Sequence, residues 1–82
     1  MSQVVKFIVA EGKVYLGEPQ DEWHVDVARR YNIPIEKVDG GGRADIDAKK
    51  IFGTSTTFGP YDAEVVRKNL PDWEIEDSKR IY

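Results

Sequence analysis

DGGGRADIDAKKIFGTSTTFGP, residues 39–60, places three consecutive glycines before Arg43 and ends in a Ser/Thr tract followed by Gly-Pro. Residues 43–47 and 50–55 form two short extended segments around Asp47-Ala48-Lys49, which predicts a β-hairpin. The glycine triplet can take positive φ angles and lets other backbone come close, so it predicts either an ordinary turn or a loop that cradles a ligand. The fold depends on how this central stretch joins its two flanks.

The N-terminal flank begins with a second predicted hairpin. Residues 4–10 alternate between the two faces of a strand, and residues 13–16 repeat the alternation after Glu11-Gly12. We therefore expect two antiparallel strands at the start of the chain.

A helix is predicted between this hairpin and the glycines. Pro19-Gln20-Asp21 is a helix-start signal, and Pro34 lies beyond the end. The residues that recur at a spacing of four are Trp23, Val27 and Tyr31, with Ala28 beside them. Residues 35–38 then form a short connection into the triplet.

The C-terminal flank predicts a second helix and a last strand. Pro60 suits the first helical position, and Pro71 stops the helix. Its apolar face consists of Ala63, Val66 and Leu70. Residues 73–77 alternate as a strand. The order ββαββαβ predicts one domain over residues 1–82 with an α/β fold of the α+β type, a mixed sheet of about five strands and two packed helices.

The composition is that of an ordinary globular chain, with 40% hydrophobic and 33% charged residues among 82. There is no cysteine and a single histidine, which excludes a thiolate metal site. We expect no metal and no cofactor.

The net charge is −3, and the basic pairs 29–30 and 49–50 are interleaved with acidic residues, so nucleic acid is not an expected partner. No apolar stretch approaches the roughly 18 residues of a membrane span, and residues 1–10 lack the features of a signal peptide. We expect a cytoplasmic monomer without a membrane partner.

His24 is the one side chain whose ordinary pKa is near neutrality. It falls in the first turn of the first predicted helix, where backbone N–H groups such as that of Val25 can bind an anion. The alternative is a surface or boundary histidine bonded to a neighbour, and the Asp21 carboxylate could cap the same N–H groups.

Arg43 and the hydroxyl tract are further oxyanion candidates. Arg43 can present a planar fork to a phosphate, or it can pair with Asp45 or Asp47. Residues 54–57 offer hydroxyls and amides ahead of a helix start, or they form an exposed turn. Taken together, these groups favour an oxyanion over an apolar ligand.

The order of these pieces resembles the Janus/Ocnus family of protein phosphohistidine phosphatases. The resemblance extends from Lys6 to Ile75. Its motifs are VVKFIVA at 4–10, LGEPQDEWHVDV at 16–27, GGGR at 40–43, KKIFGTSTTFGP at 49–60 and LPDWEI at 70–75.

This resemblance implies a metal-independent phosphatase that hydrolyses the P–N bond of phosphohistidine. His24 would be the catalytic base, with Lys6 and Arg43 positioning and neutralising the phosphoryl group. The groups holding the phosphoryl oxygens would be the N–H of Val25 and Thr57 and the Ser55 hydroxyl, with Trp23 beside them. The implied partner is a protein that carries phosphohistidine, or a small phosphoramidate.

The chain departs from the family pattern at three of these places. Leu16 stands where the family has an arginine, Trp23 replaces a tyrosine, and Thr57 replaces a small residue. The alternative is therefore a non-catalytic module on the same fold that binds phosphate or a phosphopeptide.

Overall fold

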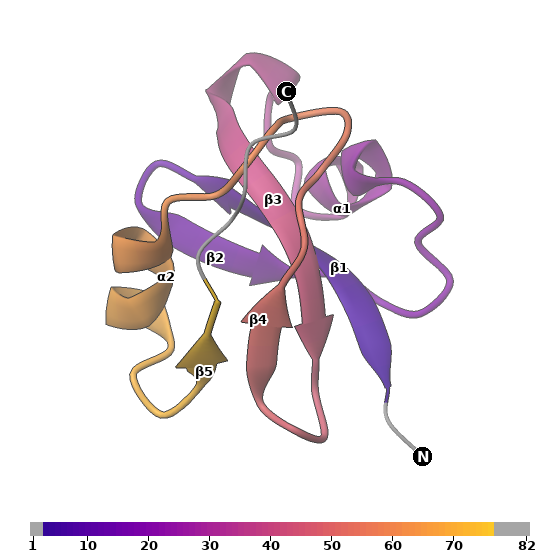
Figure 1. Ribbon diagram of the computed structural model, residues 1–82. Helices are drawn as coiled ribbons and strands as arrows, with labels where there is room; N and C mark the ends of the chain where they lie inside the picture. The colour runs from indigo at the N-terminus through magenta and orange to yellow at the C-terminus, as the bar shows by residue number, and fades with distance from the viewer. Residues whose placement is uncertain (1–2, 77–82) are drawn as a thin grey trace.

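The computed structural model describes residues 3–76 (Figure 1). Its elements are β1 (Val4–Ala10), β2 (Lys13–Leu16), α1 (His24–Arg30), the 3₁₀ turn η1 (Ile35–Lys37), β3 (Val38–Asp45), β4 (Lys50–Phe52), α2 (Ala63–Asn69) and β5 (Glu74–Ile75). The five strands form one sheet in the order β2-β1-β3-β4-β5. Neighbours are antiparallel except β4 and β5, which are parallel. The predicted mixed sheet and the order ββαββαβ are confirmed.

The two helices cover opposite faces of the sheet. Successive strand residues point to opposite faces. Phe7 of β1 belongs to the core cluster that includes Val66 of α2, whereas its neighbour Ile8 packs with Val27 of α1. Figure 1 shows the helices on different sides of the strands. The sheet thus has an α2 face and an α1 face.

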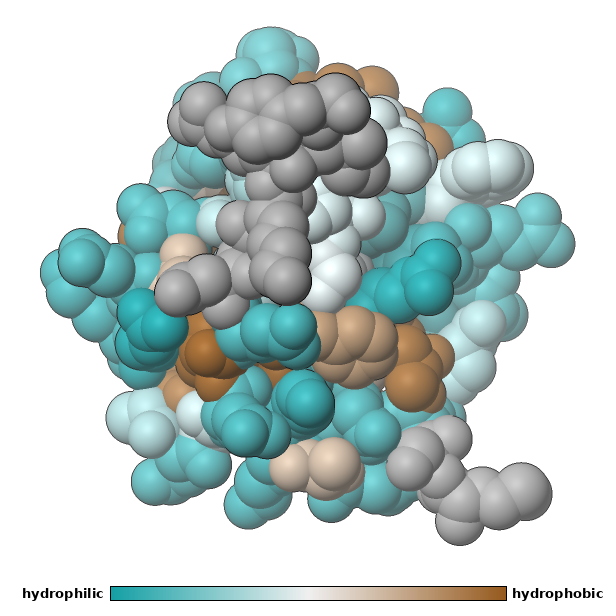
Figure 2. Space-filling model, viewed as in Figure 1, coloured by the Kyte–Doolittle hydropathy of each residue, from teal (hydrophilic) through white to brown (hydrophobic). Residues whose placement is uncertain are grey.

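The α2 face holds the larger core. Its buried members are Val5, Phe7, Val9, Ala44, Ile51, Tyr61 and Val66. On the α1 face the buried apolar members are Ile8, Val27 and Ala28. Polar residues cover most of the surface seen in Figure 2, with a small hydrophobic patch among them. Among residues 3–76, no helix has the length and apolar character needed to cross a bilayer.

The glycine triplet is not a turn, so that prediction is wrong. Residues 40–42 lie inside β3, and the described glycines with positive φ are elsewhere, at 12, 53 and 59. What the triplet supplies is close approach. A Cβ on Gly40 would lie 2.2 Å from the Pro60 carbonyl oxygen, and one on Gly42 would lie 2.7 Å from that of Phe52. The backbone of residues 52 and 60 therefore packs directly on β3, and a side chain at position 40 or 42 would push it away.

The first helix begins at His24, which confirms the predicted place of this residue in its first turn, and the start signal at residues 19–21 lies in a turn before it. The main-chain N–H of Asp21 donates to the Glu18 carbonyl at 3.0 Å, which makes residues 18–21 a turn. Trp23 precedes the helix and is 60% exposed, so it does not share the buried position of Val27 and Ala28. Tyr31, 42% exposed, follows the helix as its C-cap.

The second helix begins later than predicted, at Ala63 rather than Pro60. The Asp62 carboxylate accepts from the Glu64 N–H at 3.0 Å and caps it. The predicted helix start at Pro60 fails because this residue lies over Gly40 in a loop that crosses β3.

Strands β4 and β5 are shorter than predicted. Strand β4 ends at Phe52, and Ser55 forms only an isolated bridge with Gly59. Strand β5 covers two residues, and the predicted end of that strand at Asp77 lies outside the described residues.

Candidate active site

Lys6 and Arg43 lie directly opposite each other on β1 and β3. Lys6 precedes Ile8 by two residues, so both members of this pair lie on the α1 face. Side chains in directly opposed positions have Cβ atoms about 5 Å apart, and like charges there repel. The fold therefore places two cationic residues at opposed positions of neighbouring strands.

Neither cation has a carboxylate partner among residues 3–76. The ion pairs in that range are Asp26–Arg29, Asp21–Arg30 and Glu11–Lys37. The pairing of Arg43 with Asp45 or Asp47 that the sequence left open is not found. The Asp45 carboxylate instead accepts from main-chain N–H groups of its own turn, and that of Asp47 accepts from the Gln3 N–H.

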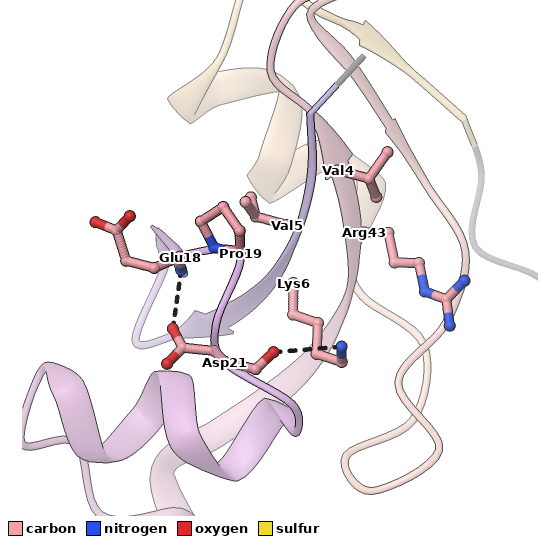
Figure 3. Close-up of a pocket in the computed structure, with 7 residues that line it drawn as sticks. All are labelled: Val4, Val5, Lys6, Glu18, Pro19, Asp21 and Arg43. Carbon is pink, nitrogen blue, oxygen red and sulfur yellow. Dashed lines mark hydrogen bonds between the residues drawn. The ribbon is translucent and has the colours of Figure 1, made fainter. Parts of the chain in front are cut away.

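A pocket of about 220 Å³ lies beside the two cations (Figure 3). Its lining residues are Val4, Val5, Lys6, Glu18, Pro19, Asp21 and Arg43. The Lys6 ammonium donates to the main-chain carbonyl of Asp21 at 3.4 Å, a long bond that leaves its other N–H groups available. The pocket thus combines the cations Lys6 and Arg43 with the acidic residues Glu18 and Asp21, and His24 is not among its lining residues.

His24 is nearly buried, with 7% of its surface exposed, and its Nε2 lies 2.8 Å from the Gly42 carbonyl oxygen. A carbonyl only accepts, so Nε2 carries the proton and the neutral ring has its lone pair on Nδ1. Every buried side-chain nitrogen or oxygen in the described part of the chain has a hydrogen-bond partner. The hydrogen bond of the His24 ring is made by Nε2, so Nδ1 is not fully buried and keeps access to solvent. The ring is fixed at one nitrogen and basic at the other.

The pKa of His24 is below its ordinary value of 6.5. Burial is the main cause, and the charges of Lys6 and Arg43 act in the same direction. The bond to Gly42 opposes them. These causes keep the imidazole neutral at pH 7, the state in which it can accept a proton.

The Val25 N–H lies in the first turn of α1, where no side chain of residues 3–76 caps it. Asp21, the competing cap considered from the sequence, bonds to Glu18 and Arg30 instead. With seven residues, α1 has little macrodipole to offer.

The loop after β4 is tied to β3 next to His24. The Ser55 N–H donates to the Gly41 carbonyl at 2.9 Å, and the Gly41 N–H donates to the Gly59 carbonyl at 3.2 Å. A Cβ on Gly41 would lie 3.1 Å from Cδ2 of His24, so the ring packs against bare strand. The glycine at 41 makes room for the imidazole.

The predicted donors of this loop serve the loop itself. Oγ of Ser55, which is 1% exposed, accepts from the N–H groups of Thr57 at 3.2 Å and Phe58 at 3.0 Å. The Thr57 N–H is therefore not free to hold a phosphoryl oxygen, although the Ser55 hydroxyl keeps its own proton. Trp23 is exposed beside His24 in the chain.

Two features escaped the sequence reading: the Gly42 carbonyl that selects the His24 tautomer, and the pairing of Asp21 with Arg30. Neither leaves a sequence signal, because both depend on side chains meeting partners nine or more positions away. Within residues 3–76, no three side chains of metal-ligating type converge. Comparisons with protein-family models, curated proteins and solved structures found no match to this chain.

Proposed function

We propose that this chain is a metal-independent phosphatase that hydrolyses the P–N bond of phosphohistidine, carried by a protein or by a small phosphoramidate. One observation supports this above all. Lys6 and Arg43 are opposed like charges without carboxylate partners in the described chain, on the sheet face where His24 is held neutral. An oxyanion between the two cations would remove their repulsion.

Phosphoryl transfer asks a protein mainly for positioning and charge stabilisation. Lys6 and Arg43 would contact the phosphoryl oxygens, where negative charge is present in both substrate and transition state. The Val25 N–H would add a neutral donor. This division leaves His24 to handle the proton.

His24 would act as general base through Nδ1. A water molecule attacks phosphorus while Nδ1 takes its proton, and the P–N bond breaks with its electron pair passing to the substrate nitrogen, which takes up a proton. General-base catalysis of this kind typically contributes about 10²–10⁴ in rate. Direct attack by Nδ1, which would transfer the phosphoryl group to His24 before water removes it, uses the same geometry.

A second candidate function is a module that binds phosphate or a phosphopeptide without turnover. Two observations favour it: the Thr57 N–H is engaged within its own turn, and Leu16 stands where the resembling family has an arginine. Fewer donors around the phosphoryl group would allow binding while weakening transition-state stabilisation.

Turnover of a simple phosphoramidate and of phosphohistidine by the purified chain separates the two functions. The phosphatase predicts release of inorganic phosphate that depends on His24. Phosphate-induced NMR shifts near Lys6 and Arg43 without turnover would support the binding module. Absence of both would contradict both functions.

A further inference from the structure

Asp21 lies in the wall of the proposed phosphate pocket, although its carboxylate bears the wrong charge for an anion site. Asp21 is nearly buried, with 8% of its surface exposed, and its own main-chain carbonyl accepts the Lys6 ammonium. The carboxylate is therefore only a few bonds from the cation that the proposed function requires.

Arg30 and the Glu18 N–H together occupy both oxygens of this carboxylate. Nε of Arg30 donates to Oδ2 at 3.0 Å, and an Nη donates to Oδ1 at 2.8 Å, which is the bidentate geometry of a strong pair. The Glu18 N–H adds a bond to Oδ2 at 2.8 Å. The hydrogen bond to Arg30 is the main cause that lowers the pKa of Asp21, so this group is charged at neutral pH.

The carboxylate and the carbonyl of Asp21 point in different directions (Figure 3). The carboxylate faces Glu18 and α1, and the carbonyl faces Lys6. If the carboxylate were released, rotation about its side-chain bonds would bring it to the flexible Lys6 ammonium. Such a pair would neutralise Lys6 and repel an incoming phosphate.

We infer that Arg30 is a positioning residue, which holds the Asp21 carboxylate away from Lys6 and so keeps the pocket open to an oxyanion. Arg30 lines no part of the pocket and acts only through Asp21. The inference rests on the anion site of the proposed function but not on its chemistry.

The test is titration of the ¹⁵N-labelled chain with inorganic phosphate, followed by NMR. Arg30→Met removes the guanidinium and keeps most of the apolar stem. We expect phosphate to bind about threefold to tenfold more weakly, the range for neutralising a partly exposed cation. Adding Asp21→Asn to Arg30→Met should restore affinity to within about twofold of the original chain.

Arg29→Met is the matched control. Arg29 is the neighbouring arginine of α1, its side chain is 75% exposed, and its carboxylate partner is Asp26 at 3.9 Å. The Arg29→Met substitution removes the same formal charge as Arg30→Met but leaves the Asp21–Arg30 pair intact. If both variants lose phosphate affinity equally, the change in net charge alone explains the loss, and the inference is overturned.

Two further outcomes would also overturn it. One is unchanged phosphate affinity in a folded Arg30→Met variant, and the other is a double variant as weak as the single one. If Arg30→Met does not fold, Arg30→Lys takes its place, with a loss of about twofold that Asp21→Asn reverses; unchanged affinity would again contradict the inference. Phosphate binding without turnover would refute the phosphatase and leave this inference intact.

Discussion

The α2 face of the sheet buries apolar side chains and Tyr61, whereas the α1 face combines a few apolar residues with Lys6, Arg43 and His24. The two faces share strands. In β1, Phe7 points to the α2 core, while Lys6 and Ile8 on either side point to α1. In β3, Gly42 is paired with Phe7, and Gly41 is paired with Ile8.

This difference explains how so small a sheet can carry an unfavourable pair of like charges. Burial of apolar surface contributes about 25 cal/mol per Å², and most of that surface is on the α2 face. The α1 face can then keep a neutral buried histidine and two cations. We expect substitutions on the α2 face to change the free energy of unfolding, and substitutions on the α1 face to change phosphate binding and turnover.

The largest effect should come from Ile51→Ala on the α2 face. Ile51 is fully buried, and truncating such a residue leaves a cavity that costs about 2–5 kcal/mol. Urea unfolding at 25 °C measures the loss. Phosphate affinity of the folded fraction should stay within about twofold of the original. A large loss of affinity at constant fold would show that the faces are not separable.

Next in size is His24→Gln on the α1 face. The glutamine side-chain amide can still donate to the Gly42 carbonyl, but it cannot act as a base. We expect phosphoramidate hydrolysis to fall by at least about 100-fold. Phosphate-induced shifts near Lys6 and Arg43 should persist. Retained hydrolysis in this variant would remove His24 from the reaction.

Arg43→Ala should weaken phosphate binding by about tenfold, because one charge-assisted contact to the oxyanion is lost. Stability should be unchanged or slightly higher, since the repulsion with Lys6 disappears. NMR titration and thermal unfolding of the same sample test both statements. A clear loss of stability would indicate that Arg43 has a structural role.

The pH dependence should follow His24. Since burial places its pKa below 6.5, the rate should rise with pH, with the midpoint of the rise below pH 6.5. The free energy of unfolding should also rise with pH in this range. The unfolded chain binds the His24 proton more readily than the folded chain does, so acidification below about pH 6.5 destabilises the fold. Rate profiles and urea midpoints between pH 5 and 7, compared with His24→Gln, check this. A rate that is flat over this range would contradict the general-base role.

The smallest expected effect is that of chelation. The proposed chemistry uses only side chains and main-chain donors, so exhaustive treatment with EDTA should leave turnover within about twofold. Added Mg²⁺ or Zn²⁺ should not increase it. Loss of activity that metal restores would require a different mechanism.

The order of elements could be predicted from the sequence, whereas the opposition of Lys6 and Arg43 comes from the pairing of β1 with β3, which no local pattern predicts. Alternation and turn signals are local, so the first hairpin, both helices and the mixed sheet could be predicted from them. His24 was a candidate because it is the single histidine of the chain and falls at a predicted helix start, and its catalytic role belongs to the proposal. The start of the second helix at Ala63 was not predicted, since the backbone contact of Pro60 with Gly40 overrides the local helix signal at Pro60.

The surroundings of these residues depend on contacts between distant parts of the chain. The glycine triplet had a local signal for a turn, but the backbone packed over Gly40 and Gly42 makes it a strand. The Gly42 carbonyl selects the proton position on His24, and Arg30 takes the carboxylate of Asp21 away from Lys6. Each of these depends on which groups meet across the fold, and a chain read residue by residue does not contain that distance information.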